Sequence, residues 1–161
     1  MNILFIIASL VALGSTFLAI TGKHAVHALL YLILSFLSVA VIFFLLGAPF
    51  LAALEVIIYA GAIIVLFLFI VMMLNLGNNG GENDWVKLGN WVGPGILSTV
   101  LLIILTIAIF QGPPSLISEH VVGPREVGLA LFGPYMLGVQ LAAMLLLAGL
   151  VGATHLRKRD F

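Results

Sequence analysis

The sequence predicts an all-α integral membrane protein with five transmembrane helices, and its composition carries that prediction. Of the 161 residues, 63% are hydrophobic and 7% are charged, whereas a soluble domain carries about 25% charged residues. The hydrophobic residues form five continuous runs, each close to the ~20 residues that a helix needs to cross the hydrocarbon core. A transmembrane β-barrel would instead alternate apolar and polar residues. We therefore expect a single transmembrane unit over residues 1–161.

Turn residues and charges separate the five runs and set their expected bounds. The spans are predicted at about 2–21, 26–46, 50–76, 92–110 and 128–155. The third run is the longest and leaves room for tilt or an irregular turn. The fifth helix has two candidate starts, Gly128 and Pro134, because a proline can break a helix that reaches it. The loops at 77–90 and 115–126 hold charged residues that cannot remain in lipid.

The basic residues predict an orientation. Lys23, Lys87 and the tail Arg157-Lys158-Arg159 fall on one side of a five-span chain, and only Arg125 falls on the other. The side with excess Lys and Arg is usually cytoplasmic. We therefore expect a periplasmic N-terminus and a cytoplasmic C-terminus.

Several functions are disfavoured by what the chain lacks. The net charge is zero, so nothing indicates nucleic-acid binding. There are no cysteines, which excludes disulfides and cysteine-ligated iron–sulfur clusters within this chain. His24 and His27 are too few for a zinc site. No metal or nucleotide constellation is visible, so the chain holds no complete active site by itself.

Glu55 is the first candidate for chemistry, because a carboxylate in hydrocarbon costs at least ~2.5–3.5 kcal/mol. No Lys, Arg or Asp lies in the hydrophobic part of any other span. Glu55 therefore either stays protonated or meets a partner from another polypeptide. It is interpreted as part of a proton relay, or alternatively as a structural carboxyl bonded to a neighbouring helix. Tyr59, at i+4 on the same helix face, either joins the relay or packs as an aromatic.

Three small residues follow Tyr59: Ala60, Gly61 and Ala62. Small residues let membrane helices approach closely, and glycine also tolerates a change of winding. The residues alone therefore leave two interpretations of this stretch, close packing against a neighbouring helix and a local change of winding. The hydroxyl and amide side chains elsewhere in the spans are expected to hydrogen-bond between helices; they are Ser35, Ser38, Ser98, Thr99, Thr106 and Gln140.

Four stretches, taken together and in order, carry a family resemblance. They are 27–32 (HALLYL), 54–63 (LEVIIYAGAI), 71–76 (VMMLNL) and 131–135 (LFGPY). The chain resembles the subunit J family of the bacterial proton-translocating NADH:quinone oxidoreductase, respiratory complex I. The mitochondrial counterpart is NADH dehydrogenase subunit 6. The resemblance covers nearly the whole chain except the loop at 77–90 and the basic tail.

This resemblance implies a cofactor-free membrane-arm subunit in the bacterial cytoplasmic (inner) membrane, beside subunits A, H, K and N. NAD, FMN, iron–sulfur clusters and quinone would belong to the whole enzyme. Glu55 and Tyr59 would border the intramembrane carboxylates that link quinone chemistry to proton transport. The third helix would hold a π-bulge near Tyr59 to Val65 that changes winding between enzyme states. The residues of that conformational switch would be Ala60, Gly61, Ala62 and Val65.

Two other functions remain as alternatives. One is a structural or assembly subunit without a direct proton role. The other is a small stand-alone channel or transporter, which is disfavoured because only one carboxylate lies in the spans and no internal repeat is visible.

Overall fold

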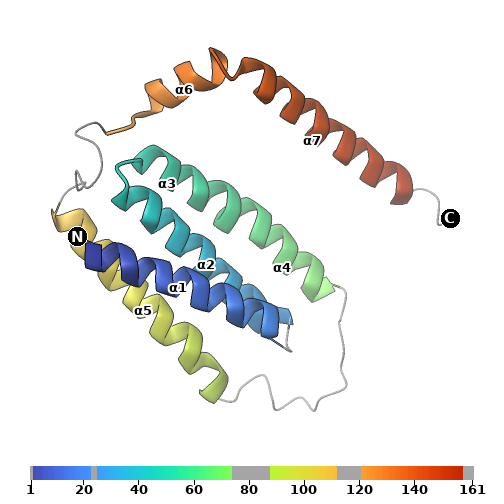
Figure 1. Cartoon of the computed structure of the whole chain (residues 1–161). Coiled ribbons are helices and arrows are strands. Elements are labelled where there is room, and N and C mark those ends of the chain that lie inside the picture. Colours follow the sequence, from blue (N-terminus) through green and yellow to red (C-terminus); the bar gives the residue numbers. More distant parts are fainter. Residues whose placement is uncertain (1, 23–24, 74–87, 112–120, 158–161) are drawn as a thin grey trace. The chain divides into compact units, whose positions relative to one another are not determined.

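A computed structural model describes residues 2–22, 25–73, 88–111 and 121–157 (Figure 1). The described residues form helices and turns without a strand, and five helical segments are long and apolar enough to cross a membrane. The predicted all-helical architecture with five spans is confirmed, whereas the orientation of the termini stays a prediction. The chain divides into two compact units, Met1–Val121 and Val122–Phe161, and we describe each in turn.

The helices lie close to the predicted spans. They are α1 (Asn2–Thr21), α2 (Ala25–Leu45), α3 (Pro49–Glu55), η1 (Val56–Ile63), α4 (Ile64–Met73), α5 (Leu88–Gln111), α6 (Pro124–Phe132) and α7 (Met136–Arg157). The third span consists of α3, η1 and α4 in succession, and the predicted residues 74–76 lie outside the described residues. Of the basic residues behind the orientation, Lys23, Lys87, Lys158 and Arg159 also lie outside them, as does His24.

The first unit is built around α2, which contacts α1 and α5 as well as the whole third span (Figure 1). Its buried cluster joins α1, α2 and α5 and comprises Ala8, Val11, Val41, Leu45, Leu101, Ile104 and Ala108. Alanines on α1 and α5 allow close approach of helix backbones, as is usual where membrane helices pack. The third span lies against α2. Ile64, the first residue of α4, is 1% exposed.

A tight turn links α2 to α3. Ala48 N–H donates to Phe43 O at 3.0 Å, and Gly47 N–H donates to Phe44 O at 3.1 Å. These two bonds form a Schellman motif, which requires a left-handed residue after the helix. Gly47 supplies it with φ of 82°. Pro49 then begins α3, at a position where its missing N–H costs nothing.

Hydroxyl groups join α1 to α2. Thr16 Oγ1 and Ser35 Oγ lie 2.6 Å apart, and Ser35 Oγ lies 3.4 Å from Ala12 O. The predicted role of Ser35 between helices is therefore seen. The other predicted hydroxyls behave differently. Ser98, Thr99 and Thr106 donate to carbonyls of their own helix, and the buried Ser38 hydroxyl has no hydrogen-bond partner among the described residues, so the prediction for Ser38 is wrong.

The second unit holds α6 and α7 with a break between them. At Gly133 the backbone leaves helical geometry (φ −101°, ψ −107°). A Cβ at this position would stand 2.6 Å from Leu129 O, so a side chain would not fit there. Pro134 then lacks the N–H that a continuing helix needs. Of the two predicted starts of the fifth span, the later one is nearer the observed start of α7 at Met136.

Candidate functional site

The third span changes its winding in the middle. Eight residues, Val56–Ile63, form the π-helix η1 between two α-helical segments. Ile64 N–H donates to Tyr59 O, five residues earlier, which is the π pattern. The flanking residues Glu55 and Ile64 both keep α-helical dihedral angles. The helix is therefore continuous, and the hydrogen bonds of its interior span one residue more than those of its ends.

The π segment lies close to where the resemblance implied one. It contains Ala60, Gly61 and Ala62, whereas Val65 lies in α4, within its first turn. A Cβ on Gly61 would meet only Val56 O, at 3.2 Å. Gly61, Ala62 and Val65 are all exposed in the first unit. The small residues thus place a narrow, open stretch of backbone on the outward side of the third span.

Glu55 is the last residue of α3 and directly precedes the π segment. Its side chain is half-buried, and its carboxylate has no hydrogen bond or ion pair with any described residue. Among the described contacts, the Tyr59 hydroxyl does not hydrogen-bond to the Glu55 carboxylate, although the two residues are four apart on the same span. The carboxylate therefore depends on a proton or on a group from outside the described residues.

Tyr59 packs on an aromatic residue of α2. The Phe36 and Tyr59 ring centroids are 5.2 Å apart, with 37° between the ring planes. Tyr59 is 44% exposed, so the contact covers only part of its ring. The sequence did not single out Phe36, because one phenylalanine in a continuous apolar run carries no distinguishing signal. The contact connects the π segment to the helix around which the first unit is built.

A second aromatic contact lies between α2 and α5. The rings of His27 and Trp91 meet edge to face, with centroids 6.2 Å apart. One turn along α2, the Tyr31 hydroxyl occupies the space that a Cβ on Gly93 would need. The absence of a side chain at Gly93 therefore leaves room for the Tyr31 hydroxyl. Pro94, inside α5, follows directly.

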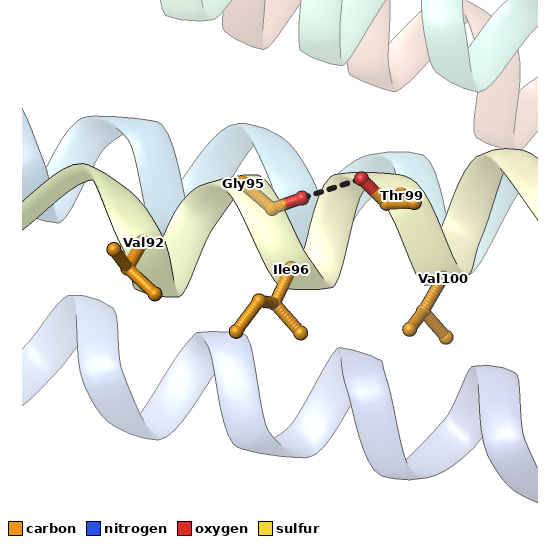
Figure 2. Close-up of a pocket in the computed structure, with 5 residues that line it drawn as sticks. All are labelled: Val92, Gly95, Ile96, Thr99 and Val100. Carbon is orange, nitrogen blue, oxygen red and sulfur yellow. Dashed lines mark hydrogen bonds between the residues drawn. The ribbon is translucent and has the colours of Figure 1, made fainter.

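α5 also bears an open groove of about 470 Å³ (Figure 2). Val92, Ile96 and Val100 line it with apolar side chains. The Thr99 hydroxyl donates to Gly95 O at 2.8 Å, within α5 (Figure 2). The groove has no titratable group in its lining, so it does not belong to the chemistry at Glu55.

The described residues contain no group of three or more His, Cys, Asp or Glu side chains that could hold a metal ion. The fold and the site together define a class of protein: a polytopic helical membrane protein whose one intramembrane carboxylate adjoins a π-wound helix.

The chain belongs to the NADH-ubiquinone/plastoquinone oxidoreductase chain 6 family, whose sequence pattern matches residues 15–156. It is similar to NADH-quinone oxidoreductase subunit J of Pseudomonas aeruginosa, with 50% identity over 99% of this chain and 98% of the relative. Subunit J of Escherichia coli K12 is 48% identical over 99% of this chain and 88% of the relative. Subunit J of Buchnera aphidicola from Schizaphis graminum is 49% identical over 98% of both chains. The resemblance drawn from the sequence is confirmed.

Proposed function

We propose that this chain is a membrane-arm subunit of a proton-translocating NADH:quinone oxidoreductase, and that its third span helps couple electron transfer to proton movement. One observation carries the coupling role: the single intramembrane carboxylate, Glu55, directly precedes eight residues of π-helix. π-helical segments inside α-helices are rare and occur frequently at functional sites.

The work of this chain would be to position and to move protons rather than to transfer electrons. Electron transfer from NADH would take place through flavin, iron–sulfur clusters and quinone on other subunits. Glu55 would hold or release a proton at its carboxylate, and Tyr59, within η1, would border the same path. A change between π and α winding would turn one end of the span relative to the other and alter what Glu55 meets.

In the assembled enzyme, other subunits would supply the partners that Glu55 does not find among the described residues. A carboxylate without a partner in hydrocarbon is costly, so neighbouring subunits would provide the hydrogen-bonding groups or water around Glu55. By family resemblance these neighbours would be subunits A, H, K and N in the bacterial inner membrane. The N-terminus would face the periplasm and the C-terminus the cytoplasm, as the basic residues predict.

The test is the change Glu55→Gln, which keeps side-chain size and hydrogen bonding but removes titration. We expect normal assembly of the enzyme and reduced protons pumped per electron, or reduced coupled turnover. Glu55→Asp keeps the titrating group and should restore part of the loss. The measurement is quinone-dependent proton uptake into vesicles, normalised to assembled complex.

The two alternatives predict different results. A purely structural subunit predicts that Glu55→Gln leaves both pumping and turnover at wild-type values once assembly is intact. A stand-alone channel predicts proton flux when the chain is reconstituted alone in liposomes, which the coupling role does not.

A further inference from the structure

The contact between Phe36 and Tyr59 has a consequence for the winding of the third span. Tyr59 lies three positions after the start of η1 at Val56, so its direction relative to α3 depends on the π turns between them. Phe36 lies on α2, outside the π-wound segment. The contact therefore joins a fixed helix to a residue whose position depends on the winding.

α2 is held in place from its other side. Ser35, the neighbour of Phe36, is buried and hydrogen-bonded to Thr16 of α1 at 2.6 Å. Further along α2, Val41 and Leu45 belong to the core cluster with α1 and α5. These contacts fix the rotation of α2 about its own axis, and they direct Phe36 toward the third span.

The geometry of the ring contact depends on the winding of the third span. Conversion of a π turn to an α turn shifts the residues beyond that turn by one position, which is a rotation of about 100° and a rise of about 1.5 Å. Tyr59 lies within the first π turn, so this shift is the upper limit of its own movement. At the Cα radius of about 2.3 Å, that rotation displaces a Cα by roughly 3.5 Å, and a ring further out moves more. Aromatic pairs attract at centroid separations of about 4.5–7 Å. The observed 5.2 Å separation would not survive such a displacement.

We propose that Phe36 is a positioning residue that holds the third span in its π-wound form by packing on Tyr59. This inference rests on the proposed function, since it assigns a control element to the same segment. Aromatic pairs of this kind shift an equilibrium by roughly two- to tenfold. Loss of the Phe36 ring should therefore favour the α-wound form by that factor.

The test measures winding directly in the assembled enzyme. The natural chain has no cysteine, so within this subunit Leu13→Cys on α1 and Leu66→Cys on α4 define a unique spin-label pair. Both positions are exposed, at 70% and 60%. Pulsed electron paramagnetic resonance then gives the distance distribution between α1 and the part of the span beyond η1. Two windings give two distances.

We expect Phe36→Leu to raise the α-wound population two- to tenfold relative to wild type, and Phe36→Tyr, which keeps a ring, to leave it near wild type. Phe44→Leu is the matched control, because Phe44 packs against the core cluster and not on Tyr59. If Phe36→Leu prevents assembly, Tyr59→Leu removes the same contact from the more exposed side and should shift the distribution equally.

The outcomes separate this inference from the proposed function. Two distances in wild type, with Phe36→Leu shifting them no more than Phe44→Leu, would overturn the role of Phe36 alone. One unchanged distance in resting and turning-over enzyme would overturn the re-winding itself and this inference with it. Pumping by Glu55→Gln is measured separately and decides the role of the carboxylate.

Discussion

Gly93 offers a sharp test of how α5 is attached to α2. Alanine at this position places a Cβ on the Tyr31 hydroxyl oxygen, whereas the next ring atom, Cζ, would stand at an acceptable 3.4 Å. Overpacking of this kind costs about 1–3 kcal/mol. Gly93 also precedes Pro94, where a side chain disfavours helical geometry and adds a cost that does not involve Tyr31.

The size of the effect follows from three variants compared in one assay. Gly95→Ala is the control, because a Cβ there meets nothing within 4 Å and only helix propensity changes, by up to about 1 kcal/mol in favour of alanine. Gly93→Ala should be the less stable of the two by roughly 1–3 kcal/mol. Tyr31→Phe removes the clashing oxygen. Combined with Gly93→Ala in a double variant, it should restore much of the lost stability and leave only the cost that comes from Pro94.

The assay is thermal loss of the subunit from detergent-solubilised complex, followed for each variant and for the double variant. The edge-to-face contact of His27 with Trp91 also joins α2 to α5, and it should loosen when Gly93→Ala disturbs the contact with Tyr31. The reasoning fails if Gly93→Ala is as stable as Gly95→Ala. It also fails if Tyr31→Phe gives no recovery, because the clash would then not lie at the hydroxyl.

Four further predictions concern other parts of the chain. Gly61→Leu should lower turnover per assembled complex, whereas Ala53→Leu, which adds one carbon less in the regular part of the span, should not; an effect on assembly alone would indicate packing. Gly47→Ala should destabilise the α2–α3 turn by about 1–2 kcal/mol, seen as a lower melting temperature, because φ is 82° there; unchanged melting would contradict the strain. Thr16→Val should cost only about 0.6 kcal/mol in the same melting assay, and a loss several times larger would mean that the hydroxyl pair does more than join two helices. A reporter fused after Phe161 should be active in the cytoplasm, and an external C-terminus would refute the orientation.

The positions of the spans could be predicted closely because the rule behind them is local. A segment of about 20 apolar residues meets the thickness of the hydrocarbon core whatever its neighbours do. The helix ends followed from equally local signals, such as Gly47 with Pro49 after α2. The fifth span shows the limit of such signals, because Gly133-Pro134 is compatible with a kink or with a break. The break is what occurs.

The candidate site could be predicted only in part. Glu55 stands out because a carboxylate is conspicuous in an apolar run, whereas the small residues after Tyr59 left close packing and a change of winding both open, and only the family resemblance implied a π-bulge there. Phe36 and Tyr31 carried no such signal, since their importance lies in what they touch. Their partners, Tyr59 and Gly93, are 23 and 62 residues away along the chain.

The sequence by itself determined the class of protein, the five spans, the intramembrane carboxylate and the family, because each depends on composition or on short motifs. Only the tertiary structure decided that the third span is π-wound over Val56–Ile63. The α and π patterns pair the same N–H groups with carbonyls one residue apart, so local sequence separates them weakly. In our proposal, packing against α2 selects between the two, through the contact of Phe36 with Tyr59. The residue that follows the π segment, Ile64, is buried.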